Sequence, residues 1–310
     1  MSTLDASLDR LAGALGPAAE RDRPLGALTT YRVGGAAALF EEVVDETRLG
    51  EVAQSTSQAG LPVLVVGRGS NLLVADRGFD GLALTLGSDF DTLSVEGTTV
   101  RAGGALSLPV LARRTAAAGL RGLEWAVGVP GSVGGAVRMN AGGHGSDTAA
   151  TLVAYRWVDL ATGSVGESSA DRLQAGYRHT ALADTEVVVS GIFELEAGDP
   201  ADGAAAIAEI VRWRRVHQPG GPNAGSVFTN PPGDSAGRLI DACGLKGLRI
   251  GTAEVSPKHA NFIQCDPGGS ADDVLAVIER VRSLVGEATG ISLRTEVRLV
   301  GFPGRPEDRS

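Results

Sequence analysis

Two glycine-rich segments of the chain have the composition of ligand-binding loops. The first, Gly67-Arg-Gly-Ser-Asn71, follows the apolar run 62–66 and combines two glycines with a guanidinium, a hydroxyl and a side-chain amide. Glycines permit positive φ, so successive backbone N–H groups can point at one anion. The third glycine and the following helix of a Rossmann fingerprint are missing. Taken alone, such a segment is more often a hairpin connection.

The second segment, 128–143, has glycines at positions 128, 131, 134, 135 and 142 before Gly143 ends it. Pro130 restricts the backbone, and the glycines remove the Cβ atoms that would block a ligand. The two segments lie about sixty residues apart within one predicted domain. That arrangement suits the two ends of a long cofactor that contains a pyrophosphate.

Three further segments carry polar groups suited to chemistry. An aromatic ring, a guanidinium and an imidazole are adjacent in 176–180, and 223–231 offers a serine and two asparagines. In 291–298, strand alternation places Ser292, Arg294, Glu296 and Arg298 on one face. Taken singly, a solvated strand face or a structural serine hydrogen bond is commoner than catalysis.

Spacing and capping residues predict the elements that position these segments. Leucines at 4, 8, 11 and 15 predict an amphipathic helix, and Ser107 begins a helix that ends at Gly119. Asp199 with Pro200 begins a helix that runs to about His217, and Ser270 caps another over 271–287. We also predict a helix at 234–242, a glycine-rich loop at 126–146, and strands at 62–66, 81–86, 152–159, 186–195, 226–228, 252–255, 261–265 and 292–300.

Composition excludes several classes of protein. The 310 residues carry 28 Lys+Arg against 37 Asp+Glu, a formal net charge of −9, which disfavours a nucleic-acid or anionic-membrane binder. No apolar stretch is long enough for a membrane span, and the first residues lack a secretory signal. Cys243 and Cys265 build no disulfide framework, and the four histidines show no metal-binding spacing. These features predict a cytoplasmic protein without a metal.

An ordered set of motifs adds a resemblance to this interpretation. The motifs are Thr29–Gly35, Gly67–Leu73, Gly128–Gly135, Met139–Gly142, Gly176–Arg178, Ala224–Phe228, Asn230–Pro231, Ala236–Asp241, Gly244–Gly247, His259–Ile263 and Glu296–Arg298. In this order they resemble the UDP-N-acetylenolpyruvoylglucosamine reductase family, flavoenzymes of peptidoglycan precursor synthesis. The likeness covers about 28–301, and the absence of a tyrosine-bearing insertion between Arg178 and Ser226 resembles the shorter type II members.

The resemblance implies an α+β fold class. It predicts an FAD-binding domain of the vanillyl-alcohol-oxidase (PCMH) type, made of two α+β subdomains, followed by a C-terminal α+β substrate-binding domain. We therefore expect an N-terminal helix and linker over 1–27 and the FAD-binding domain over 28–198, with halves at about 28–90 and 91–198. The substrate-binding domain follows over 199–303, with a polar tail over 304–310.

The family's functional residues carry over onto matching positions. Arg178 matches the arginine that polarises the substrate carboxylate, Glu296 its acidic partner, and Ser226 the serine that protonates carbon. Tyr177 and Asn230 match substrate-binding positions. The expected FAD-binding residues are Gly67, Arg68, Gly69, Ser70, Asn71, Gly131, Ser132, Gly134, Gly135 and Asn140.

The implied reaction is the FAD-dependent, NADPH-driven reduction of the enolpyruvyl double bond of UDP-N-acetyl-3-O-(1-carboxyvinyl)-glucosamine to UDP-N-acetylmuramate. We expect a monomer that binds this UDP-sugar and NADPH, with no nucleic acid and no membrane insertion. One alternative is a flavin oxidoreductase of the same fold with another small substrate, and a second is a non-catalytic nucleotide-binding protein. Thr229 stands where a lysine is common, which leaves one substrate-phosphate contact open.

Overall fold

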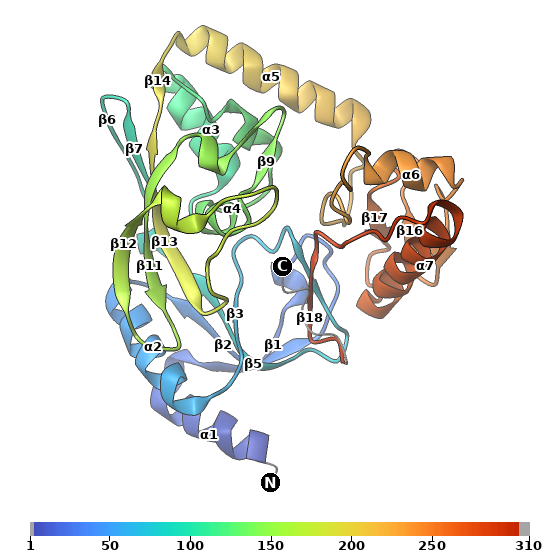
Figure 1. Cartoon of the computed structure of the whole chain (residues 1–310). Helices are drawn as coiled ribbons and strands as arrows, with labels where there is room; N and C mark the ends of the chain where they lie inside the picture. Colours follow the sequence, from blue (N-terminus) through green and yellow to red (C-terminus); the bar gives the residue numbers. More distant parts are fainter. Residues whose placement is uncertain (1–2, 304–310) are drawn as a thin grey trace. The chain divides into compact units, whose positions relative to one another are not determined.

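The computed structural model describes residues 3–303, and their ribbon is shown in Figure 1. Within these residues the chain divides into two units. Unit 1 comprises 3–21, 38–68 and 81–214, and unit 2 comprises 22–37, 69–80 and 215–303. Unit 2 therefore combines two early segments with the C-terminal part of the chain. The domain boundaries predicted above concern which residues bind cofactor and substrate, and they stay a prediction.

The helices of the described chain are α1 (Thr3–Leu15), α2 (Glu46–Ala59), α3 (Leu108–Ala117), α4 (Val133–Met139), α5 (Pro200–His217), α6 (Ala236–Ala242) and α7 (Ala271–Thr289). The strands are β1 (Glu20–Pro24), β2 (Ala36–Val43), β3 (Val63–Val65), β4 (Leu72–Val74), β5 (Phe79–Leu86), β6 (Leu93–Glu96), β7 (Thr99–Gly103), β8 (Leu120–Arg121), β9 (Gly142–Gly143), β10 (Ser146–Asp147), β11 (Leu152–Asp159), β12 (Val165–Ser169), β13 (Glu186–Glu194), β14 (Glu196–Ala197), β15 (Arg249–Ile250), β16 (Ala253–Val255), β17 (Ile263–Cys265) and β18 (Arg298–Val300).

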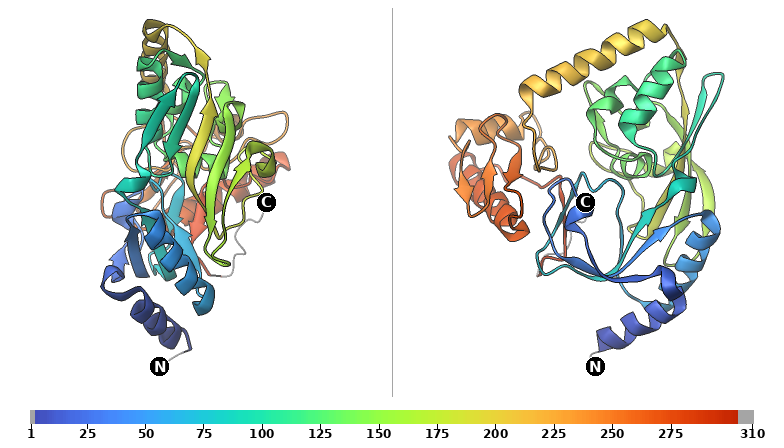
Figure 2. Two further views of the ribbon diagram at one scale, coloured as in Figure 1. Left: turned by 90° about the vertical axis from the view of Figure 1, so that its left-hand side faces the viewer. Right: turned by 180° about the vertical axis from the view of Figure 1, so that it is seen from behind.

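An antiparallel sheet in the order β12-β11-β13-β7-β6 forms the centre of unit 1 (Figure 2). Successive side chains of a strand point to opposite faces, so β13 serves two cores at once. Val188 packs with the residues of α3 and α4, whereas Val187 and Val189 pack with those of α1 and α2. A second sheet, in the order β1-β2-β5-β3, adds Leu39 and Leu82 to the core of α1 and α2. Both faces of β13 are therefore buried.

Helix α4 lies within the segment that we predicted to be a loop, 126–146, and in this respect the prediction is wrong. The side chain of Ser132 caps the helix, because its Oγ accepts a hydrogen bond from Gly135 N at 3.4 Å. Gly134 permits close packing on β13, since a Cβ there would lie 2.8 Å from Val188 O. Gly134 is typical of a loop in the sequence, but in the structure it is needed for the close contact between α4 and β13.

Unit 2 has its own core, in which α6 and α7 pack against the sheet β15-β16-β17 (Figure 1). Helix α7 begins as predicted, with the Oγ of Ser270 accepting hydrogen bonds from Asp272 N and Asp273 N. The carboxylate of Asp76 accepts from Ala271 N at 3.0 Å, which ties an early segment to this helix. Strand β4 pairs in parallel with β18. The C-terminal part of the chain therefore needs segments that precede it by more than half of the sequence.

Most of the predicted elements are confirmed, including α1, α5 and α7. The predicted strand 226–228 is wrong, because it forms only an isolated bridge between Phe228 and Thr295. The side chain of Asn261 forms hydrogen bonds with both the N–H and the C=O of Phe228, so these groups cannot pair with a neighbouring strand. The strand predicted over 292–300 is confined to β18, although residues 292–298 alternate between exposed or half-buried and buried as expected. The predicted tail, 304–310, lies outside the described residues.

Candidate active site

The two glycine-rich segments meet inside unit 1. A Cβ at Gly67 would lie 2.6 Å from the Oγ of Ser132, so a side chain at position 67 is excluded without rearrangement. Ser132 is buried, at 3% exposure, whereas Gly67 and Arg68 are exposed. Gly135 is also exposed, and a Cβ there would meet only Ser132 Oγ, at 3.4 Å. The structure thus brings together residues from both predicted cofactor-binding segments, with an open glycine surface.

The backbone N–H groups of these segments fall into two sets. Gly134 N donates to Gly104 O at 2.9 Å, and Gly135 N donates to Ser132 Oγ, so both are used within the fold. Across 3–303, no hydrogen-bond partner exists for the N–H groups of Gly67, Arg68, Gly131 and Ser132. The second set provides the donors that an anion requires.

The first segment continues into unit 2 with Gly69, whose φ of 58° lies in the left-handed region. A Cβ there would collide with Leu28 O. Thr30 N donates to Gly69 O at 3.1 Å, and Thr30 Oγ1 is buried without a hydrogen-bond partner among the described residues. A buried hydroxyl without a partner is rare unless a ligand or water completes it. Both parts of this segment therefore fit a polar cofactor such as FAD, with its pyrophosphate.

Arg178 lies in a tight turn of unit 1 with unusual backbone geometry. Gly176 and His179 exchange backbone hydrogen bonds of 2.9 and 3.2 Å, which places Arg178 at a φ of 56°. Its guanidinium donates to Gly142 O at 2.7 Å and lies 5.3 Å from the centre of the Tyr177 ring. Tyr177 itself is 54% exposed. The predicted catalytic arginine and the predicted substrate-binding tyrosine are therefore in contact.

The side chain of Asn140 is fully engaged with protein groups. Its Nδ2 donates to Gly176 O at 3.0 Å and to Asp147 Oδ2 at 3.1 Å, while its Oδ1 accepts from Ala149 N at 2.9 Å. The residue is 4% exposed and has a φ of 41°. It joins the end of α4 to the turn that carries Arg178. Its contact with FAD stays a prediction.

Hydrogen bonds to backbone groups connect the segments of unit 2 that carry three predicted site residues, Asn71, Ser226 and Glu296. Glu296 N donates to Val227 O at 2.7 Å, directly beside Ser226. On its other side, Glu296 O accepts from Asn71 Nδ2 at 3.0 Å, and Arg298 N donates to Asn71 O at 3.0 Å. The structure thus places the serine and the carboxylate residue on neighbouring extended segments, with Asn71 next to them.

Asn261 supports this arrangement and was not among the predicted site residues. Its Oδ1 accepts from Phe228 N at 3.0 Å, its Nδ2 donates to Phe228 O at 2.8 Å, and its own C=O accepts from Val227 N at 2.9 Å. It is 4% exposed. Burial and the charge of Lys246 lower the pKa of the neighbouring His259. The only signal for this role was the presence of Asn261 in the motif His259–Ile263.

Two further positions are used partly for structure. Asn230 Oδ1 accepts from Ala236 N at 3.1 Å and so satisfies a donor at the start of α6. Thr229 is 8% exposed, and its hydroxyl donates to Arg294 O at 3.3 Å. The substrate-binding role of Asn230 stays a prediction. Across residues 3–303, no three His, Cys, Asp or Glu side chains are grouped to hold a metal ion.

Comparison with known proteins identifies the two halves of the chain. Residues 37–169 match the FAD-binding domain family, and residues 216–300 match the C-terminal domain of UDP-N-acetylenolpyruvoylglucosamine reductase. The crystal structure of UDP-N-acetylenolpyruvylglucosamine reductase from Thermus caldophilus is 35% identical, has a TM-score of 0.81, and covers 91% of this chain and 98% of its own. The predicted fold class, an FAD-binding domain followed by a C-terminal α+β domain, is confirmed.

Relatives match over nearly the full length. UDP-N-acetylenolpyruvoylglucosamine reductase 2 of Symbiobacterium thermophilum is 44% identical over 285 residues, which cover 91% of this chain and 92% of that protein. The reductase of Synechococcus sp. strain WH7803 is 45% identical over 286 residues, 90% of this chain and 92% of its own. With two domain matches in order and this identity throughout, the chain belongs to the UDP-N-acetylenolpyruvoylglucosamine reductase family.

Proposed function

We propose that this protein catalyses the FAD-dependent, NADPH-driven reduction of the enolpyruvyl double bond of UDP-N-acetyl-3-O-(1-carboxyvinyl)-glucosamine to UDP-N-acetylmuramate, a step of peptidoglycan precursor synthesis. The observation that carries the proposal is the pairing of Glu296 with Val227, at 2.7 Å, which sets Ser226 beside Glu296. A serine and a glutamate on neighbouring segments can supply a hydroxyl and a carboxyl group for the protonation of a carbanion-like intermediate.

FAD is held by the glycine-rich segments. The free N–H groups of Gly67, Arg68, Gly131 and Ser132 would hold its phosphates, and Gly135 offers a surface without a side chain. Ser70 and Asn71 add polar groups, and Gly134 allows the approach of α4 to β13. When bound, FAD would supply the hydride-transfer chemistry that links NADPH to the terminal carbon of the enolpyruvyl group.

Arg178 and Glu296 stabilise the charge that this transfer creates. Hydride addition to the terminal carbon leaves an enolate, whose negative charge spreads onto the substrate carboxylate. The Arg178 guanidinium binds that carboxylate, and Tyr177 and Asn230 bind other parts of the substrate. Glu296, in its acid form, donates a hydrogen bond to the same enolate. Both groups then act most strongly when the charge is greatest.

Ser226 donates its proton to the adjacent carbon and completes the reduction. A serine hydroxyl is a weak acid, so this step requires a strongly basic enolate directly beside it. The backbone bond between Val227 and Glu296 keeps Ser226 and the carboxyl group on neighbouring segments. The proton lost by Ser226 is then replaced from solvent.

The test is a visible absorption spectrum of the purified protein, followed by anaerobic NADPH and then the enolpyruvyl UDP-sugar. We expect a flavin spectrum that bleaches with NADPH and returns with this substrate. A flavin that bleaches but ignores the substrate would instead support the alternative, a flavin oxidoreductase of the same fold with another small substrate. Absence of flavin after addition of FAD would overturn the proposal.

We further propose that the protein acts in the cytoplasm as a monomer and binds no nucleic acid. Its net charge of −9 supports the last point. Among residues 3–303, none of the helices combines the length and the apolar character of a membrane span. Sedimentation of the FAD-loaded protein tests the monomer, and a stable dimer at micromolar concentration would contradict it.

A further inference from the structure

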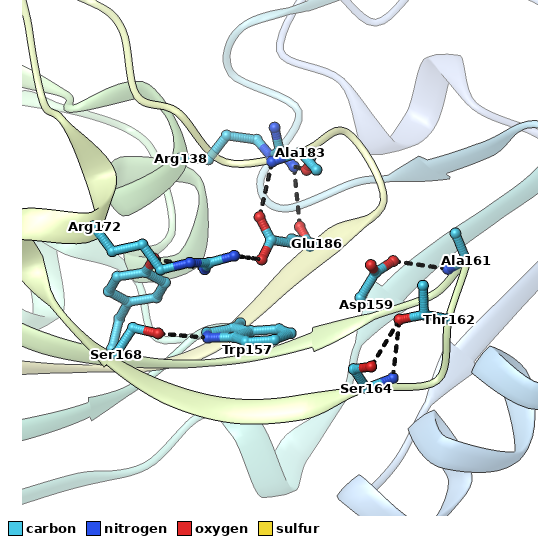
Figure 3. Close-up of polar contacts among 11 residues, drawn as sticks. Arg138, Trp157, Asp159, Ala161, Thr162, Ser164, Ser168, Arg172, Ala183 and Glu186 are labelled. Carbon is cyan, nitrogen blue, oxygen red and sulfur yellow. Dashed lines mark hydrogen bonds and ion pairs between the residues drawn. The ribbon is translucent and has the colours of Figure 1, made fainter.

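The turn that carries Arg178 is tied to unit 1 at both of its ends. After the turn, Thr180 Oγ1 donates to Arg138 O at 2.6 Å. Figure 3 shows Arg138 reaching Ala183 O and Glu186 O, the latter at 3.0 Å, beyond the turn. The carboxylate of Glu186 accepts from Ala183 N at 2.8 Å. The segment after Arg178 is therefore fixed by several bonds that depend on α4 and β13.

Before the turn, a single side chain performs the same task. Asn140 Nδ2 is the side-chain donor to Gly176 O, at 3.0 Å, and His179 N donates to the same oxygen at 3.2 Å from within the turn. Gly176 N donates to His179 O, so its peptide group is part of the turn itself. Arg178 also donates to Gly142 O, two residues after Asn140. The strand pair β9-β10 and the turn are thus joined through Asn140.

We propose that Asn140 is a positioning residue for Arg178, and that its amide sets the orientation of the turn toward the substrate carboxylate. The inference rests on the function proposed above for Arg178. It assigns Asn140 a role different from the FAD contact predicted from the sequence, since its three amide hydrogen bonds all go to protein groups.

Few other residues can perform this task. The φ of 41° favours asparagine, aspartate or glycine, and the buried site requires both donors and an acceptor. Asp147 fixes the direction of the amide, because its Oδ2 accepts from Asn140 Nδ2 and its Oδ1 accepts from Ala150 N. With the amide so oriented, its second N–H points at Gly176 O.

The decisive variant is Asn140→Asp, which keeps the size and the acceptor for Ala149 N but removes both donors. We expect the protein to bind FAD and to be reduced by NADPH at the wild-type rate. Reoxidation by the enolpyruvyl UDP-sugar should slow by about 100-fold, because a small misplacement of a substrate-binding group has an effect of that size. Thermal unfolding of the FAD-loaded variant checks that it folds.

Asp147→Asn is the matched control, and its combination with Asn140→Asp separates two roles. The single variant keeps both donors of Asn140 but weakens the contact that orients them, so reoxidation should slow by less than in Asn140→Asp. The double variant exchanges donor and acceptor between positions 140 and 147, which restores the contact between these two side chains but removes the side-chain donor to Gly176 O. Slow reoxidation in the double variant supports the proposal, and full recovery would show that only the link to Asp147 matters.

A double-mutant cycle with Arg178→Ala adds a readout that a purely structural role would not move. If Asn140 acts through Arg178, Asn140→Asp should slow reoxidation little further once Arg178 is absent. Loss of FAD from Asn140→Asp, or equal slowing of both half-reactions, would overturn the proposal in favour of a cofactor contact. A wild-type protein that the UDP-sugar fails to reoxidise would instead contradict the proposed function.

Discussion

The turn that carries Arg178 and the two segments that carry Ser226 and Glu296 are held in different ways. Of the six non-glycine residues with positive φ in 3–303, three lie in or next to the Arg178 turn: Asn140, Gln174 and Arg178. The segments around Ser226 and Glu296 contain none of the six. The first region is strained and tied by side chains, whereas the second is relaxed and joined mainly by backbone hydrogen bonds.

This difference determines what a substitution reveals. In the Arg178 region, a changed side chain such as Asn140 releases the backbone that positions a catalytic group. The backbone bond between Val227 and Glu296 persists when the side chain of Ser226 or Glu296 is changed, so a substitution at either of these positions reports mainly on chemistry. Strain at functional sites persists only where the surroundings enforce it. The two regions therefore call for different experiments.

The largest effect is expected for Ser226→Ala, which removes the proton donor and leaves the bond between Val227 and Glu296 intact. Reoxidation of the flavin by the UDP-sugar should slow by about 10²–10⁴-fold, the usual contribution of an acid catalyst. Flavin reduction by NADPH should be unchanged, as measured by anaerobic stopped-flow absorbance. Equal slowing of both half-reactions would remove Ser226 from the proposed role.

Glu296→Gln should affect the same half-reaction to a smaller degree. The amide keeps the shape and the backbone bonds to Val227 and Asn71, but it loses the acid proton. We expect reoxidation to slow by about 100-fold, which is typical of losing one group that stabilises a developing oxyanion. Steady-state turnover at the wild-type rate would exclude Glu296 from the mechanism.

Asn261→Ala tests a side chain that holds the relaxed region through two hydrogen bonds to Phe228. It leaves the buried N–H and C=O of Phe228 without partners, which should lower the free energy of unfolding by about 2–4 kcal/mol. Urea unfolding of the FAD-loaded protein measures the loss. In contrast to Asn140→Asp, the folded fraction should keep the wild-type ratio between the rate of flavin reduction by NADPH and the rate of reoxidation by the UDP-sugar. A selective loss of reoxidation would show that Asn261, like Asn140, positions a group that acts in that half-reaction.

The smallest effect concerns Asp273, in the first turn of α7. Hydrogen bonds from Thr252 N and Oγ1, of 2.7 and 2.8 Å, lower the pKa of its carboxyl below the ordinary 3.8. Because the folded-state pKa is depressed, this contribution to stability is present above about pH 4 and is lost as the pH falls through the folded-state value. The free energy of unfolding of Asp273→Asn should therefore fall less steeply than that of the wild type as the pH is lowered. Unfolding followed by circular dichroism at several pH values measures this dependence. An unchanged acid profile would show that the bonds contribute nothing.

Sequence patterns predicted the elements that rest on local signals. Helices α5 and α7 have capping residues and regular apolar spacing, and residues 292–298 keep the predicted alternation of exposure. Helix α4 was missed because Gly134 and Gly135 weaken a helical signal. Its formation depends on contact with Val188 O, which no local pattern contains.

The motifs also placed the candidate residues in two regions, but they did not reveal how these are supported. Asn140 and Asn261 bond to backbone groups 36 and 33 residues away. Such pairings depend on the tertiary fold, and asparagine in a motif is equally compatible with ligand binding. The structure therefore adds the supporting contacts, and the roles of the predicted residues stay to be tested.

The parallel pairing of β4 with β18 has a consequence for synthesis of the chain. Leu72 pairs with Arg298, so the partner of β4 leaves the ribosome roughly 10–45 s later at a translation rate of about 5–20 residues per second. Throughout that interval, an apolar strand has an open edge that invites pairing with other chains. Unit 2 can therefore close only after residues 298–300 have been made, and newly made protein should depend on chaperones more than its size alone would suggest.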